Sequence, residues 1–188
     1  MTTAAPSREL AIDATDIDAA AARLAGHAVL TPLLENAVLN ERAGGRVLLK
    51  AETLQHTGSF KFRGAWNRLS QLTPAERAAG VVAWSSGNHA QGVAYAAQLL
   101  GIRAAIVMPH DAPQIKIDNT RRLGGEVIGY DRYREVREEI GTRIARERGA
   151  IIVPAYDDPH IIAGQGTVGR EIASQAAAIG LAVDQALF

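Results

Sequence analysis

The sequence predicts an α/β fold in which parallel sheets are flanked by helices. Short segments that are apolar throughout, as buried strands are, alternate with segments that have helical periodicity, and this alternation is typical of βαβ units. Glycine or proline closes most of these segments. At 188 residues the chain is long enough to bury a core for one good-sized domain or two small ones.

Composition narrows the functional classes. The chain has 20 Lys+Arg and 20 Asp+Glu, so its formal net charge is zero, which argues against a nucleic-acid or anionic-membrane partner. It has no cysteine, which excludes disulfides and thiolate chemistry. Its histidines lack the spacing of a zinc site, so we expect no metal. The N-terminal residues do not resemble a signal peptide and no apolar run could cross a bilayer, so we expect a cytoplasmic protein.

The N-terminal elements are short. Residues 1–11 resemble a loose polar tail, and Thr15 to Asp18 resembles a capping box that begins a helix ending at Gly26. Thr31-Pro32-Leu33 is expected to be extended, because the residue before a proline avoids the helical region. A helix and then a buried strand with a continuous apolar run follow: Ala37–Ala43 and Val47–Leu49.

From residue 60 onward, helices and strands alternate regularly. Helical periodicity predicts these helices: Phe60–Leu72, Ala90–Leu100, Gln114–Leu123, a long helix through Tyr133, Val136, Ile140 and Ile144 to Gly149, and Val168–Ile179. Thr73 to Glu76 is a further helix start, with a capping box and a proline in the first turn. Continuous apolar runs predict these strands: Val81–Trp84, Ala105–Met108, Val127–Ile128, Ala150–Val153, and the beginning of one at Gln185–Phe188.

The regular part of the pattern suggests a domain division. The four predicted strands between Val81 and Pro154 form a set that is compact enough for a small α/β domain. We therefore expect residues 81–158 to form that domain. Residues 1–80 and 159–188 would then belong to a second, larger one.

The segment Thr57 to Ala65 carries the first chemical signal. Lys61 follows the pair Gly58-Ser59 near the start of a predicted helix, with Phe60 and Phe62 on either side. A lysine that reacts as a nucleophile needs a neutral amine, and its surroundings can lower its pKa from about 10.4 toward roughly 7–8. A solvated helix lysine is the common alternative, but the preceding glycine and serine suit a loop that approaches a ligand closely.

The second signal, Ser85 to Gly92, lies where the strand Val81–Trp84 turns into the next helix. Backbone N–H groups at a helix start bind anions such as carboxylates. Ligands of open parallel sheets also bind at the carboxyl ends of the strands. An ordinary capping loop uses serine, glycine and asparagine as well, so this segment by itself does not decide between binding and capping.

A third segment, Gly164 to Gly169, matches the dinucleotide-binding pattern GxGxxG. That pattern requires a strand that runs directly into the glycines. Here the nearest predicted strand ends at Pro154, and Asp157 to His160 is expected to form a turn. A nucleotide-binding α/β module is therefore an alternative function that the context disfavours.

Taken together at this spacing, Gly58–Ala65 and Ser85–Gln91 resemble the fold-type II pyridoxal-phosphate enzymes, in particular the threonine/serine dehydratases and serine racemase. The resemblance extends from about Thr31 to the end of the chain. It implies a fold like that of the tryptophan synthase β-subunit. Met108-Pro109 and the proline-containing loop before Lys116 match a further segment of the family, in which we expect Lys116 to be structural or solvated.

The resemblance implies pyridoxal 5'-phosphate as the cofactor and a role for each site residue. Lys61 would hold the cofactor as an imine and would remove the Cα proton of the substrate. Asn88 would hydrogen-bond the 3-oxygen of the pyridine ring. Ser86 matches the serine that acts as acid and base on the face opposite the lysine in serine racemase, where biosynthetic threonine dehydratases often have alanine. The substrate carboxylate would be held by this loop: Ser85, Ser86, Gly87, Asn88 and His89.

The implied reaction is the β-elimination of a hydroxy amino acid such as threonine or serine to a 2-keto acid and ammonia. The expected partners are a small amino-acid substrate and, for a full-length protein, further copies in a homo-oligomer. Racemisation of serine and dehydration of 3-hydroxyaspartate are alternatives within the same family.

The resemblance also implies a departure from the family pattern. Family members continue, beyond the segment that matches Val183–Phe188, into a glycine-rich loop that cradles the cofactor phosphate. We therefore expect the chain to hold a complete small domain and an incomplete large one. An inactive truncated fragment is a further alternative.

Overall fold

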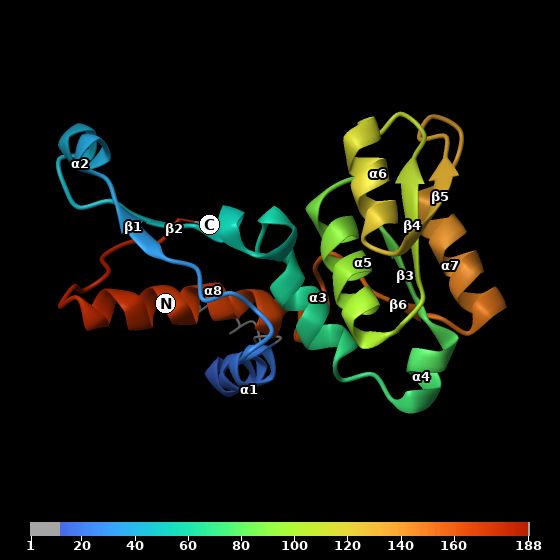
Figure 1. The fold of residues 1–188 in the computed structure, drawn as a ribbon, viewed down its shortest axis with the longest axis horizontal. Coiled ribbons are helices and arrows are strands. Elements are labelled where there is room, and N and C mark those ends of the chain that lie inside the picture. Colours follow the sequence, from blue (N-terminus) through green and yellow to red (C-terminus); the bar gives the residue numbers. More distant parts are fainter. Residues whose placement is uncertain (1–11, 188) are drawn as a thin grey trace, which may run out of the picture.

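The computed structural model describes residues 12–187. It has two lobes, with helix α3 (Lys61–Leu69) between them (Figure 1). One lobe holds a four-stranded sheet and its helices. The other holds the N-terminal elements and the long helix α8 (Pro159–Ala178). The expected polar tail, residues 1–11, lies outside the described residues.

The four-stranded sheet is parallel throughout and has the order β5-β4-β3-β6. Its strands are β3 (Val81–Trp84), β4 (Ala104–Pro109), β5 (Gly125–Tyr130) and β6 (Ile151–Ile152). Their connecting helices are α5 (Asn88–Leu100), α6 (Gln114–Arg122) and α7 (Arg137–Arg148). From β3 the chain passes to β4 and β5 and then returns to the other side of β3 as β6, so the strand order reverses at β3. The predicted α/β fold with a parallel sheet is confirmed.

Both faces of this sheet are buried, as its apolar strands predict, because successive side chains of a strand point to opposite faces. On one face, residues such as Val81 and Ile106 pack with α3, α5 and α6 in the larger core cluster. On the other face, Val82 and Val107 pack with Ile144 of α7. The helices thus cover both faces of the sheet, so a ligand can approach it at the ends of the strands.

The second lobe contains a separate antiparallel pair, β1 (Leu33–Glu35) and β2 (Leu48–Lys50), joined by α2 (Ala37–Ala43). A strand was expected over Val47–Leu49, but the expectation that it is buried is wrong. Leu49 is 48% exposed, and its cross-strand partner Leu34 is 49% exposed. A continuous apolar run indicates burial only where both faces of a sheet are covered, and no layer among the described residues covers this face.

Several element boundaries differ from the prediction. The predicted long helix through Tyr133 and Val136 begins only at Arg137, because Arg132 to Arg134 form a turn and Val136 is the N-cap of α7. The capping box of α1 (Ala14–Leu24) uses Asp13, whose carboxylate accepts from the N–H groups of Thr15 and Asp16. α8 begins at Pro159 after the N-cap Asp158, so the expected turn at Asp157–His160 is largely a helix start. Residues 185–187 are irregular instead of beginning a strand, and Phe188 lies outside the described residues. The capping box of α4 (Pro74–Ala79) is confirmed.

Helix α3 packs tightly against helices of both lobes. A Cβ on Gly164 of α8 would stand 2.6 Å from the Arg63 carbonyl oxygen and 2.8 Å from the Gly64 Cα, both in α3. A Cβ on Gly92 of α5 would stand 3.0 Å from the carbonyl carbon of Lys61. Only glycine allows such approaches, so these glycines fix where α3 lies between the two lobes. Among residues 12–187, no helix is both long and apolar enough to cross a bilayer.

Candidate active site

The reversal of strand order places the candidate site at one edge of the parallel sheet. The loop Ser85–Gly87 follows β3, and the segment Val153–Ala155 follows β6. Because β3 and β6 are hydrogen-bonded neighbours, the two segments lie side by side at the carboxyl ends of their strands. Ligands of open α/β sheets bind at such reversal points.

Lys61 reaches this edge from the first position of α3. Its Nζ donates a hydrogen bond to the Ala155 carbonyl oxygen at 3.1 Å and lies 4.9 Å from the centre of the Phe60 ring. The side chain is half-buried, and the loss of hydration lowers the pKa of its amine. A lysine amine with a lowered pKa is a better base and nucleophile near neutral pH.

The chain has three lysines, and their surroundings differ. Lys50 forms an ion pair of 2.6 Å with Glu171 in a buried cluster. Lys116 is half-buried, with its Nζ 3.9 Å from the place where a Cβ on Gly87 would stand. The amine of Lys61, in contrast, meets a neutral carbonyl at the reversal point.

The loop after β3 ends at the N-terminus of α5. Ser85 Oγ accepts from the Gly87 N–H at 3.2 Å, and Gly87 is the N-cap of the helix that Asn88 begins. The first N–H groups of an α-helix lack intrahelical acceptors and carry the positive end of the helix dipole. The N–H groups of Asn88 and His89 are therefore able to bind an anion at the same edge.

Asn88 lies on the face of α5 that meets Lys61. It stands one helical turn before Gly92, and residues four apart share a helix face. Gly92 is the point where α5 touches the Lys61 backbone. Asn88 and the backbone of Lys61, which are far apart in the sequence, thus lie on the same side of α5.

The imidazole of His89 points toward the same segment as Lys61. It is 3% exposed, and its Nε2 lies 3.0 Å from the Val153 carbonyl oxygen. Because a carbonyl only accepts, Nε2 carries the hydrogen. Burial lowers the pKa of His89 to about 4, opposed by the bond to Val153 and assisted by the positive charge of Lys61. A neutral imidazole cannot pair with a carboxylate as a cation, so the group of His89 that can bind an anion is its backbone N–H.

A pocket of about 90 Å³ adjoins the loop and contains residues that sequence reasoning missed. Its lining comprises Ser85, Ser86, Val107, Pro109, Tyr130, Arg132 and Arg137. Arg132 forms an ion pair with Asp111, and Arg137 with Glu138. Guanidinium and hydroxyl groups together suit a carboxylate. Arg132 lies in a turn that follows β5, and Arg137 is the first residue of α7. The place of Arg132 after a strand end was the signal available in the sequence.

Buried polar atoms without a partner indicate that these residues fit a polar cofactor. Within the described residues, Thr57 Oγ1, Ser59 Oγ and His89 Nδ1 are buried and have no hydrogen-bond partner. Thr57 also has a φ of 60°, which is uncommon for a residue other than glycine. Leaving a buried polar group unpaired costs roughly 1–3 kcal/mol. Two of the atoms precede Lys61 closely in the chain, so a polar group held at Lys61 would have hydrogen-bonding atoms at hand.

The glycine pattern from Gly164 to Gly169 belongs to no nucleotide site. All of these residues lie inside α8, whereas a dinucleotide fingerprint needs a loop between a strand and a helix. Gly164 serves the contact with α3, and a Cβ on Gly166 would stand 3.0 Å from Ile17 of α1. The nucleotide-binding alternative is therefore wrong.

Comparisons with known proteins show the family of this chain. Residues 24–187 match the family model described as pyridoxal-phosphate dependent enzyme. The chain is 52% identical over 157 residues to an L-threo-3-hydroxyaspartate ammonia-lyase of Pseudomonas sp., which covers 84% of the chain and 49% of that protein. It is 53% identical over 142 residues to an L-threonine ammonia-lyase of Thermotoga maritima, which covers 76% of the chain and 35% of that protein.

Solved structures give the same result for the fold. The structure of maize serine racemase matches with a TM-score of 0.87 and 38% identity, over 90% of this chain and 52% of that one. The fold is thus that of the fold-type II enzymes. The chain spans about half the length of the curated relatives it matches.

Proposed function

The chain belongs to the family of pyridoxal-phosphate-dependent enzymes, and from that membership we propose that its protein eliminates the β-hydroxyl group of a hydroxy amino acid. The products would be a 2-keto acid and ammonia. The observation that carries this proposal is the setting of Lys61, whose desolvated amine stands at the reversal point of the sheet beside the Ser85–His89 loop.

The residues at the site would have different roles in this reaction. Pyridoxal phosphate, when bound, supplies an electron sink for charge that develops at Cα. Lys61 would hold the cofactor, and its amine, with a lowered pKa, would remove the Cα proton. Asn88, on the face of α5 toward Lys61, would orient the cofactor ring.

The substrate carboxylate would lie between the loop and the pocket. The backbone N–H groups of Asn88 and His89 offer the positive end of a helix. Ser85 and Ser86 offer hydroxyl groups, and the nearby guanidinium of Arg137, which pairs with Glu138 through Nε, offers its other N–H groups. A carboxylate held by such donors would keep the Cα–H bond in a fixed orientation, and such positioning lowers the barrier to proton removal.

The substrate class follows from the relatives. Proteins similar to this chain carry the names L-threo-3-hydroxyaspartate ammonia-lyase, L-threonine ammonia-lyase and serine racemase. The amino acids in these names all carry a hydroxyl group on Cβ. We therefore propose threonine, serine or 3-hydroxyaspartate as the substrate, with elimination as the reaction and racemisation as the second candidate, which Ser86 favours.

Covalent trapping tests the role of Lys61. The chain is mixed with pyridoxal phosphate, reduced with borohydride and digested, and the modified lysine is identified by mass spectrometry. We expect the adduct on Lys61. Lys61→Ala should abolish it, whereas Lys116→Ala, which removes the other lysine near the loop, should leave it unchanged.

Two results would contradict the assignment. One is an adduct that maps to Lys50 or Lys116 in the wild-type chain. The other is an adduct of equal yield in Lys61→Ala. Release of 2-keto acid from L-threonine, L-serine and L-threo-3-hydroxyaspartate, compared with a blank of free cofactor, then ranks the substrates.

A further inference from the structure

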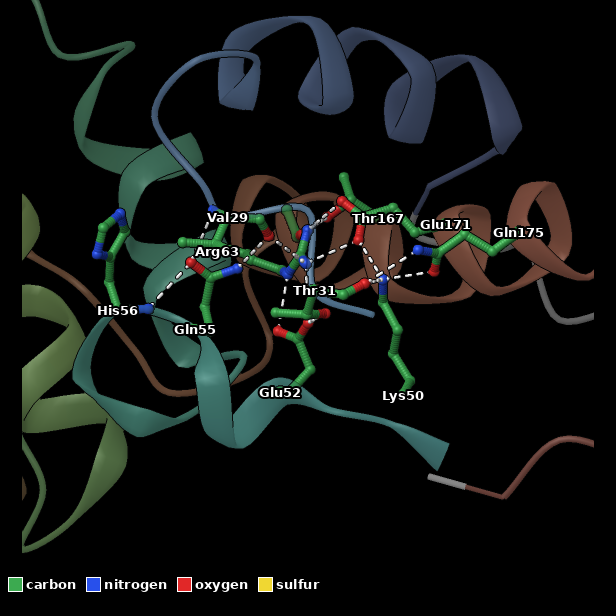
Figure 2. A network of polar contacts seen from close by, with 11 residues as sticks. Val29, Thr31, Lys50, Glu52, Gln55, His56, Arg63, Thr167, Glu171 and Gln175 are labelled. Carbon is green, nitrogen blue, oxygen red and sulfur yellow. Dashed lines mark hydrogen bonds and ion pairs between the residues drawn. The ribbon is translucent and has the colours of Figure 1, made fainter. Parts of the chain in front are cut away.

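Arg63 follows Lys61 by two positions on α3, but its side chain is completely buried and points into the second lobe (Figure 2). Its guanidinium makes bidentate ion pairs with two carboxylates. Glu52 accepts from Nε and Nη2, each at 2.8 Å. Glu171 accepts from Nη1 at 2.7 Å and from Nη2 at 2.9 Å. Every nitrogen of the guanidinium is therefore bonded to a carboxylate, the strongest kind of hydrogen bond that arginine forms.

Lys50 completes this group as a second cation. Its Nζ lies 2.6 Å from Glu171 Oε2 and donates to Thr31 O at 2.6 Å and to Gln175 Oε1 at 2.8 Å. All three hydrogens of the ammonium are thus used. The Arg63 cluster, defined as Arg63, Lys50, Glu52 and Glu171, contains two positive and two negative charges. A buried ion requires such pairing, because an unpaired one costs several kcal/mol.

The Arg63 cluster joins segments that are distant in the sequence. It links the first turn of α3 with β2, with the short 3₁₀ turn at Glu52–Leu54 and with the middle of α8. The loop before β1 is tied in as well, because Thr31 Oγ1 donates to Glu52 at 2.6 Å. The first turn of α3 is therefore held from the side opposite to the Lys61 amine.

Lys61 is held from the other side by the segment that precedes α8, through the Ala155 carbonyl. The first turn of α3 is therefore bonded at two points to the chain that follows β6. Lys61 bonds to Ala155, which precedes α8, and Arg63 bonds to Glu171, which lies in α8. A displacement of this turn would move the Lys61 amine relative to the Ser85–His89 loop.

We propose that Arg63 is a positioning residue for Lys61, because the Arg63 cluster fixes where the first turn of α3 lies and hence where the lysine amine stands. This proposal rests on the proposed role of Lys61 in holding the cofactor. Arg63 itself faces away from the sheet edge and touches no reacting group.

The charge balance of the cluster has a second consequence for Lys61. An unpaired arginine two residues away would repel the protonated lysine, but Glu52 and Glu171 neutralise it. The groups that face the Lys61 amine are the Ala155 carbonyl, the Phe60 ring and, from α5, the buried imidazole of His89. The pKa of Lys61 is therefore lowered by burial of its amine. That burial depends on the position of the first turn of α3.

Competitive labelling with a trace of acetic anhydride over a pH series tests the proposal without any cofactor. Mass spectrometry gives the labelling curve of each lysine, with Lys116 as the internal standard. Arg63→Lys keeps the charge but loses the bidentate geometry, and Glu171→Gln keeps the volume but removes the ion pairs of this carboxylate with Arg63 and Lys50. Arg68→Lys is the matched control, because Arg68 lies on the same helix and pairs with Asp158 at 3.2 Å.

In Arg63→Lys and Glu171→Gln we expect the midpoint of the Lys61 curve to rise toward its ordinary value, because the released amine regains water. The yield of the borohydride-fixed adduct at Lys61 should fall about tenfold or more, as a small misplacement of a reacting group can cost up to about 100-fold. Arg68→Lys should lower the denaturation midpoint and leave both readouts unchanged. Where Arg63→Lys does not fold, Glu171→Gln alone decides.

The outcomes separate the two proposals. No adduct on wild-type Lys61 overturns the proposed function, while the labelling midpoint still tests Arg63. An adduct on wild-type Lys61 with an unchanged midpoint and yield in a folded Arg63→Lys overturns the positioning role. Equal shifts in Arg68→Lys would also overturn it, since they would reflect general loosening of α3.

Discussion

At the scale of single residues, the surroundings of each lysine decide what it can do. Lys50 is neutralised by a carboxylate inside the Arg63 cluster, so its amine is not available to react. Lys61 has a carbonyl as its partner and a pKa that burial lowers. The same functional group therefore serves as a structural ion in one place and as a candidate base in the other.

Ser86 is expected to distinguish racemisation from elimination. Making the other enantiomer requires a proton donor on the face of the substrate opposite Lys61, and general acid–base help is typically worth about 10²–10⁴-fold. In a protein that holds the cofactor, Ser86→Ala should lose its activity on D-serine and keep much of it on L-substrates. The measurement is keto-acid release from each enantiomer. An equal loss on both would mean that Ser86 holds the carboxylate and moves no proton.

The buried imidazole of His89 should make the fold sensitive to mild acid. Its pKa is lowered from 6.5 to about 4, so between these pH values the unfolded chain binds a proton that the folded chain does not. The stabilisation is fully present above about pH 6.5 and is lost as the pH falls toward 4, with a total on the order of 3 kcal/mol.

Urea unfolding at a series of pH values checks this expectation against His89→Gln, which does not titrate but has an amide N–H to donate toward Val153. Wild type should lose more unfolding free energy than the variant as the pH falls. An imidazole that titrates near 6.5 in the folded chain by NMR would refute it.

At the scale of elements, the glycines of α8 act through close packing. The helix crosses α3 where Gly164 meets the backbone of Arg63 and Gly64. Arg63 and Gly64 cannot make room for a larger side chain at this point, because the atoms in contact belong to the backbone of α3. The glycine pattern that resembles a nucleotide fingerprint is therefore explained by helix–helix contact.

Gly164→Ala is accordingly expected to destabilise the fold. The new methyl group would meet the Arg63 carbonyl oxygen at 2.6 Å and the Asn67 Cβ at 2.8 Å, and overpacking of this kind typically costs about 1–3 kcal/mol. Gly45→Ala is the control, since no described atom lies within 4 Å of a Cβ there, and its effect should stay within about 0.5 kcal/mol. Chemical denaturation measures both. Equal stability of the two variants would mean that α8 can shift to make room.

At the scale of the whole molecule, the two lobes differ in how well they are covered. The parallel sheet has helices on both faces, whereas the exposed side of the β1–β2 pair presents Leu34 and Leu49 to solvent. Leu30 and Leu54 in the same lobe are 67% and 59% exposed. We propose that residues 81–158 form a separate domain, and limited proteolysis with cleavage confined to its flanks would support that division.

The exposed leucines should make the chain self-associate. Leu34 and Leu49 are exposed cross-strand neighbours, exposed apolar surface is typical of an interaction face, and unpaired strand edges add to the tendency. Replacing Leu34 and Leu49 together by serine should shift sedimentation velocity profiles toward the monomer. The double replacement of Leu99 and Ile115, which are exposed on the other lobe, should not. If both double variants associate like wild type, another surface is responsible.

The sequence by itself determined the parallel α/β fold, because alternating apolar runs and helical stripes are local patterns. It also predicted Lys61 and the Ser85–His89 loop as the chemical segments, since their residue types and spacing are readable along the chain. Only the tertiary structure decided that Leu49 is exposed, that Gly164 packs against α3, and that Arg63 and Arg137 have the neighbours they do. Those properties depend on contacts between residues that lie far apart in the sequence, for example Arg63 with Glu171, and no local pattern records which distant groups will meet.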